Sequence, residues 1–77
     1  MNLSNLDFED LVGFLKLRTQ EIEIYGTCHL HHVIGVWMGI MHYPAEDIND
    51  QNATKIVNVL TDAKILKQQD SERYVWV

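Results

Sequence analysis

The sequence contains few of the residues that interrupt or crosslink a chain. Its 77 residues include one cysteine, one proline and four glycines. The single cysteine, Cys28, excludes an intramolecular disulfide, whereas small secreted domains usually need several bridges. Residues 1–5 show neither the basic start nor the apolar segment of a secretion signal. We therefore expect an intracellular, cytoplasmic domain without long flexible linkers.

Long hydrophobic runs and known enzyme motifs are also missing. The longest apolar stretch, residues 33–41, is much shorter than the about 20 residues that span a bilayer. There is no phosphate-binding glycine loop and no dinucleotide fingerprint. A chain of this length buries only about 60% of its unfolded surface, which leaves little room for a catalytic cleft. We expect one domain over residues 1–77 that is no enzyme, needs no cofactor and does not enter a membrane.

Basic side chains are scarce, and their distribution is uneven. The formal net charge is −5. Residues 1–49 carry this whole acidic excess, while charges of opposite sign balance in residues 50–77. The second part nevertheless holds most of the cations, which are Lys55, Lys64, Lys67 and Arg73. The chain therefore offers two surfaces of different chemistry, one acidic and one mixed.

Hydrophobic periodicity predicts the elements of the first half. Phe8, Leu11, Val12 and Leu15 have the spacing of one helix face and predict a helix over residues 7–18. Residues 21–25 alternate polar and apolar side chains, which predicts a half-buried strand near residues 22–25. A second helix is expected over residues 28–41. It is apolar nearly all round, so it should be buried or should bury itself against a partner.

A break at Pro44 and a polar turn separate this helix from a third one. Asn49 or Asp50 is the expected cap of a helix over residues 50–63, and residues 65–67 and 73–77 read as a hairpin. The predicted class is α+β, with three helices and a small antiparallel sheet in the order α-β-α-α-β-β. The strand near residues 22–25 should pair with the hairpin. The expected core comprises Phe8, Leu11, Val12, Leu15, Ile24, Leu30, Ile34, Trp37, Ile56, Val57, Leu60, Ile65 and Val75.

The element order and the C-terminal part resemble winged helix-turn-helix domains. In that superfamily a leucine near the end of the recognition helix is followed, about five residues on, by an apolar pair that starts the wing. Leu60 and the pair Ile65 and Leu66 stand in these places. Many members have glycine before the pair, where this chain has Lys64. The resemblance is strongest over residues 50–77 and concerns the fold, which does not determine function.

The resemblance implies that the third helix enters the major groove of DNA and that the wing touches the backbone. The residues that we expect at this surface are Gln51, Thr54, Lys55, Asn58, Lys64, Lys67 and Arg73. The first four include types that hydrogen-bond base edges, and the last three would meet phosphates. Interleaved carboxylates should make a monomer bind weakly, whereas a homodimer would double the contacts. The prediction is a sequence-specific DNA-binding regulator.

The acidic N-terminal region supports a different function. Its carboxylates could meet a basic protein through charge complementarity, as in an adaptor or a phage-type inhibitor. The residues of this alternative site are Asp7, Glu9, Asp10, Glu21 and Glu23.

A cluster of potential metal ligands surrounds the start of the second helix. Cys28, His29, His31 and His32 lie together, and His42 is isolated from them. A structural zinc usually takes four ligands from paired, closely spaced donors. Since no second cysteine is present, we expect no metal site.

Overall fold

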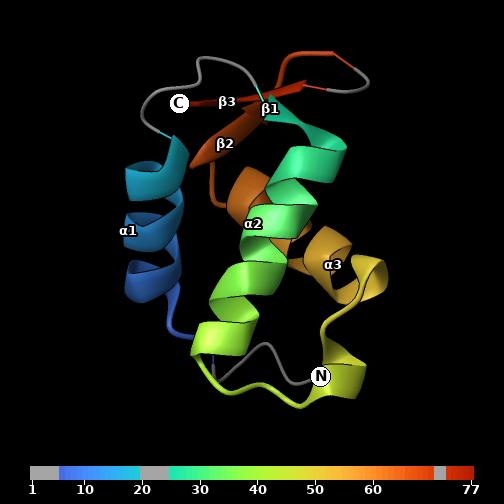
Figure 1. Ribbon diagram of the computed structural model, residues 1–77. Coiled ribbons are helices and arrows are strands. Elements are labelled where there is room, and N and C mark those ends of the chain that lie inside the picture. The colour runs from blue at the N-terminus through green and yellow to red at the C-terminus, as the bar shows by residue number, and fades with distance from the viewer. Residues whose placement is uncertain (1–5, 20–24, 71–72) are drawn as a thin grey trace.

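The computed structural model describes residues 6–19, 25–70 and 73–77, with the backbone alone for residues 19, 25–29 and 73. The described residues form helix α1 (Phe8–Thr19), strand β1 (Tyr25–Gly26), helix α2 (Thr27–Ile40), the 3-10 helix η2 (Ala45–Asp47), helix α3 (Asp50–Asp62) and strands β2 (Leu66–Gln68) and β3 (Arg73–Trp76). The protein is therefore α+β, in the predicted order, with η2 inside the predicted polar turn (Figure 1).

The three α-helices lie close to their predicted bounds. Each begins and ends within one residue of the expected position. Of the predicted strand near residues 22–25, Tyr25 belongs to β1, and residues 22–24 lie outside the described residues. Among the described residues, no helix combines the length and the hydropathy that a membrane crossing requires.

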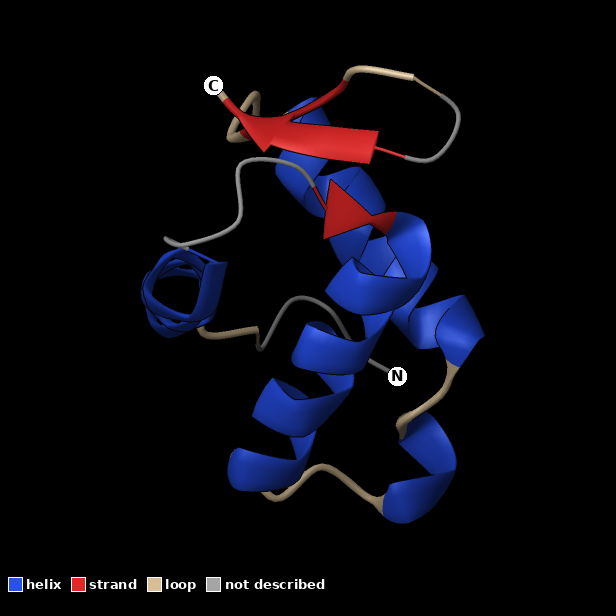
Figure 2. Ribbon diagram, turned by 45° about the horizontal axis from the view of Figure 1, so that its top comes forward, coloured by secondary structure: helices blue, strands red, loops and turns tan. Residues whose placement is uncertain are grey.

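The sheet lies at one end of the helices, and its strand order is β1-β3-β2 (Figure 2). Both pairings are antiparallel, with Tyr25 opposite Tyr74 and Leu66 opposite Trp76. Side chains alternate between the two faces of a strand. Leu66 is buried, and Trp76 beside it packs against the core. Lys67 and its partner Val75 therefore belong to the other face.

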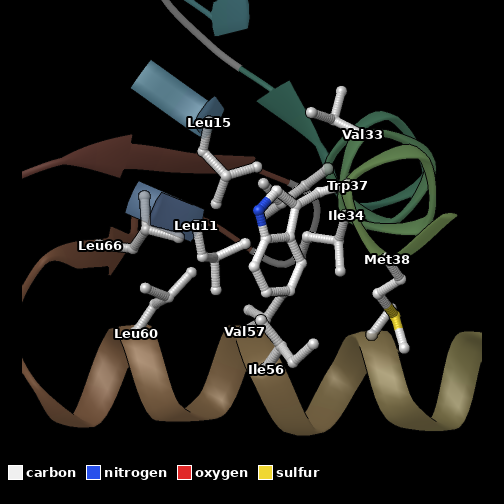
Figure 3. Packing of buried hydrophobic residues seen from close by; sticks show 12 residues of the cluster. Leu11, Leu15, Val33, Ile34, Trp37, Met38, Ile56, Val57, Leu60 and Leu66 are labelled. Carbon is white, nitrogen blue, oxygen red and sulfur yellow. The ribbon is translucent and has the colours of Figure 1, made fainter. Parts of the chain in front are cut away.

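The helices bury their apolar faces against one another and against β2. The fully buried large side chains come from α1 (Leu11, Leu15), α2 (Leu30, Ile34, Trp37, Met38) and α3 (Ile56, Leu60) (Figure 3). The predicted core was wrong at Val75, because Tyr74 and Trp76 of β3 pack inward in its place. It also missed Val33, Met38, Ala53 and Leu66, which are buried. Phe8, Val12 and Ile65 are partly buried at the margin of the core, and Ile24 lies outside the described residues.

The side chains of two asparagines form hydrogen bonds at the start of α3. Oδ1 of Asn49 accepts a hydrogen bond from the backbone N–H of Asn52 at 2.9 Å, so Asn49 is the N-cap. The buried side chain of Asn52 donates from Nδ2 to the carbonyl oxygen of Asp47 at 2.7 Å. The second bond joins η2 to α3, which sets the position from which α3 begins.

A left-handed residue follows each of the helices α2 and α3, two positions after the last helical residue. The φ angles of His42 and Lys64 are 62° and 60°. After α3, the N–H of Ile65 donates to the carbonyl of Leu60 and the N–H of Lys64 to that of Thr61. This is the Schellman arrangement, which usually has glycine at the left-handed position. Lys64 therefore stands, in a left-handed conformation, directly before the apolar pair Ile65 and Leu66.

Candidate nucleic-acid interface

Helix α3 presents one polar face outward and one apolar face inward. Its buried side is formed by Asn52, Ala53, Ile56, Val57 and Leu60. The predicted base-contacting residues Gln51, Thr54, Lys55 and Asn58 are all exposed. The Thr54 hydroxyl donates to the carbonyl of Asp50 at 2.8 Å, so its proton is used within the helix and its oxygen can still accept. The fold thus brings these four predicted residues onto one accessible face.

A groove of about 450 Å³ runs between the end of α3 and the hairpin. We call it the α3–hairpin groove, and its lining residues are Asn58, Thr61, Lys64, Leu66, Lys67, Gln68, Tyr74 and Val77. Lys64 and Lys67 thus line the same groove, although Lys64 follows α3 and Lys67 lies in β2. Asn58 belongs both to this groove and to the exposed face of α3. The two surfaces are therefore continuous.

The α3–hairpin groove is lined by basic side chains, whereas the acidic side chains of α3 do not line it. Lys64 and Lys67 line it, and none of the described residues that line it has an acidic side chain. The exposed Asp50 lies at the other end of α3, where its Oδ1 is 3.4 Å from Nδ1 of His31. Asp62 is also exposed. Arg73 contributes its backbone to β3, and its side chain lies outside the described residues.

The predicted acidic surface is present in part, at the start of α1. Asp7, Glu9 and Asp10 are exposed. Oδ1 of Asp7 accepts a hydrogen bond from the backbone N–H of Asp10 at 3.1 Å, as an N-cap does. Oδ2 of Asp10 accepts from the indole of Trp37 at 2.8 Å. Two of these carboxylates therefore have structural roles, and Glu21 and Glu23 lie outside the described residues.

The histidines are separated by the fold. His31 is paired with Asp50, the exposed His32 lies on another side of α2, and His42 occupies the left-handed position after α2. Among the described residues, no group of three or more histidine, cysteine or acidic side chains could hold a metal ion. The side chains of Cys28 and His29 lie outside the described residues.

A second groove, of about 290 Å³, lies between α1 and α2. We call it the α1–α2 groove, and its lining residues are Phe14, Arg18, His32, Val33 and Val36. Of these residues, the sequence analysis considered only His32, as a potential metal ligand. The sequence signal for this groove is that residues 28–41 carry apolar side chains on nearly all sides of the helix. A helix that buries only one face would have polar side chains on the opposite face.

No known protein family, curated protein or solved structure matches the chain significantly.

Proposed function

We propose that the chain is a winged-helix module that binds duplex DNA in a sequence-specific manner and acts as a non-catalytic regulator. In this proposal α3 lies in the major groove, and the hairpin of β2 and β3 lies along the adjacent backbone. The order of elements and the left-handed residue before the apolar pair support the winged-helix assignment.

The observation that carries the proposal is the continuity of the α3–hairpin groove with the exposed face of α3. Lys64 and Lys67 offer charge to a phosphate in the groove, and Asn58 lies at its junction with the helix. Phosphate contacts supply affinity and position, whereas amide side chains such as those of Gln51 and Asn58 can read base edges. Both kinds of contact are available on one continuous surface.

A titration of fluorescent duplex DNA of random sequence, followed by anisotropy at low and moderate salt, tests the proposal. Lys64→Ala and Lys67→Ala should each weaken binding and reduce the salt slope by about one, since each phosphate contact contributes about 0.9 to it. Lys16→Ala removes the same charge from α1, where Lys16 lies over the Trp76 ring and does not line the groove, and it should leave the salt slope unchanged. DNA affinity that is undetectable even at low salt would reject the proposal.

A second candidate function rests on the exposed Asp7, Glu9 and Asp10 at the start of α1. These carboxylates would recognise a basic protein, as an adaptor or inhibitor does. A single stoichiometric partner, retained after nuclease treatment and lost in Asp7→Asn combined with Glu9→Gln, would support it over DNA binding. If the double variant kept the partner, the acidic surface would not be the contact.

A further inference from the structure

The α1–α2 groove continues into exposed apolar side chains on both helices. Val36 and Ile40 in α2 are 43% and 54% exposed, and Leu17 in α1 is 68% exposed. Residues three or four positions apart lie on the same face of a helix, so Ile40 extends the surface from Val36 and Leu17 extends it from Phe14. Helix α2 contains no aspartate, glutamate, lysine or arginine. This face is therefore apolar along its middle.

The two ends of this face carry opposite charges. Asp10, Phe14 and Arg18 are spaced by four residues and form one stripe along α1. The guanidinium of Arg18 lies over the Phe14 ring, 5.1 Å from its centroid, and His32 lines the groove at the same end. Asp10 lies at the opposite end, where it is bonded to Trp37. Among the described residues, this stripe therefore has a carboxylate at one end, an aromatic ring in the centre and a guanidinium at the other end.

We propose that this face binds a second copy of the chain across a two-fold axis that passes near Phe14. Phe14 is midway between Asp10 and Arg18, so the axis would place Arg18 of each copy opposite Asp10 of the other. Each charge lies about 6 Å along the helix from Phe14, because an α-helix rises about 1.5 Å per residue. In a symmetric dimer the same patch must be complementary to itself, and this stripe has that property.

Charge complementarity distinguishes a second copy from other occupants. A partner segment of uniform charge would be attracted at one end of the stripe and repelled at the other. DNA would meet Asp10 as well as Arg18. A second copy in antiparallel orientation satisfies both ends, and its Val36 and Ile40 would cover the apolar centre. Asp10 can accept a further bond while it keeps the one from Trp37, because a carboxylate has several acceptor positions.

This dimer leaves the α3–hairpin groove free. The two grooves share no lining residue. Two copies would double the number of lysines that can meet phosphates, so the inference is compatible with DNA binding. The dimer inference does not depend on DNA binding, because self-association is measured without DNA.

Sedimentation velocity of the full chain, over a concentration series up to about 1 mM, tests the proposal. The wild-type chain should sediment as a dimer at high concentration and as a monomer at low concentration. Val36→Glu should raise the dimer dissociation constant by about tenfold or more, because each copy would bury a charge in the apolar centre. Gln51→Glu adds the same charge on the exposed face of α3 and should leave the dimer dissociation constant unchanged. A wild-type chain that stays monomeric, or a dimer that Val36→Glu does not weaken, would overturn the proposal.

Two charge reversals test the antiparallel orientation. Asp10→Arg and Arg18→Asp should each weaken the homodimer, because both copies would then present like charges to each other. An equimolar mixture of the two variants should recover the dimer, since one copy would carry a cation at both ends of the stripe and the other a carboxylate at both ends. Glu9→Arg, a matched reversal at the same end of α1, keeps both charges of the stripe and should leave the homodimer unchanged. A mixture of Asp10→Arg and Arg18→Asp that stays monomeric, or a Glu9→Arg homodimer weakened as much as that of Asp10→Arg, would refute the assigned pairing.

Discussion

Trp37 in α2 donates a hydrogen bond from its indole Nε1 to Oδ2 of Asp10 in α1, over 2.8 Å. The Trp37 side chain is fully buried, so without Asp10 its N–H would lack the partner that buried indoles usually have. The bond fixes the start of α1 beside the second half of α2. It thereby determines which end of the α1–α2 groove is negative.

Replacing Asp10 by alanine should lower the free energy of unfolding. The indole N–H would be left without an acceptor, which costs about 1–3 kcal/mol. Asp10→Asn keeps an acceptor for the indole N–H and should lower the free energy of unfolding by less. Urea unfolding measures the difference, with Glu9→Ala at the neighbouring exposed position as the control. Equal stabilities of Asp10→Ala and Glu9→Ala would show that the bond contributes nothing.

Lys64→Gly should stabilise the fold and weaken DNA binding. Lysine at a φ of 60° is strained, whereas glycine adopts this conformation freely. We expect a gain of about 1 kcal/mol in the free energy of unfolding. The same substitution removes a cation from the α3–hairpin groove. Thermal unfolding and DNA anisotropy on one variant separate the two effects, and a loss of stability would contradict the strain argument. Lys67→Gly in β2 is the control and should destabilise.

Leu60→Ala should lower the free energy of unfolding by roughly 2–5 kcal/mol, because this fully buried side chain would leave a cavity. Val59, the preceding residue, is half-buried, and Val59→Ala should lower the free energy of unfolding by less than about 1 kcal/mol. Chemical denaturation of both variants gives the comparison. A loss below about half a kcal/mol for Leu60→Ala would count against the packing of α3.

Gln51→Ala and Asn58→Ala should relax sequence discrimination more than they weaken binding to random DNA. Each amide that contacts a base edge is worth about 1–3 kcal/mol between the right and the wrong base pair. Selection of preferred sites from a random duplex pool, followed by titrations of preferred and mismatched sites, measures this difference. Unaltered discrimination in both variants would show that α3 does not read bases.

The hairpin shows where reasoning from the sequence was incomplete. The sequence predicts the apolar pair Ile65 and Leu66, but it places Val75 in the core and leaves out Leu66, which is buried. The left-handed turn at Lys64 and the pairing of Leu66 with Trp76 set the register in which Leu66 is buried. A shift of one residue moves every side chain to the other face of a strand, and register depends on contacts between strands.

The order and the bounds of the helices were determined by the sequence alone, because periodicity and the cap at Asn49 act within a few residues. The exposed face of α3 follows from the same local pattern, once Ile56, Val57 and Leu60 are buried. Only the tertiary structure decided which distant residues meet. The Asp10–Trp37 bond, the meeting of Lys64 and Lys67 with Tyr74, and the α1–α2 groove all join separate elements. Such contacts depend on how whole helices and strands pack, which no short stretch of residues specifies.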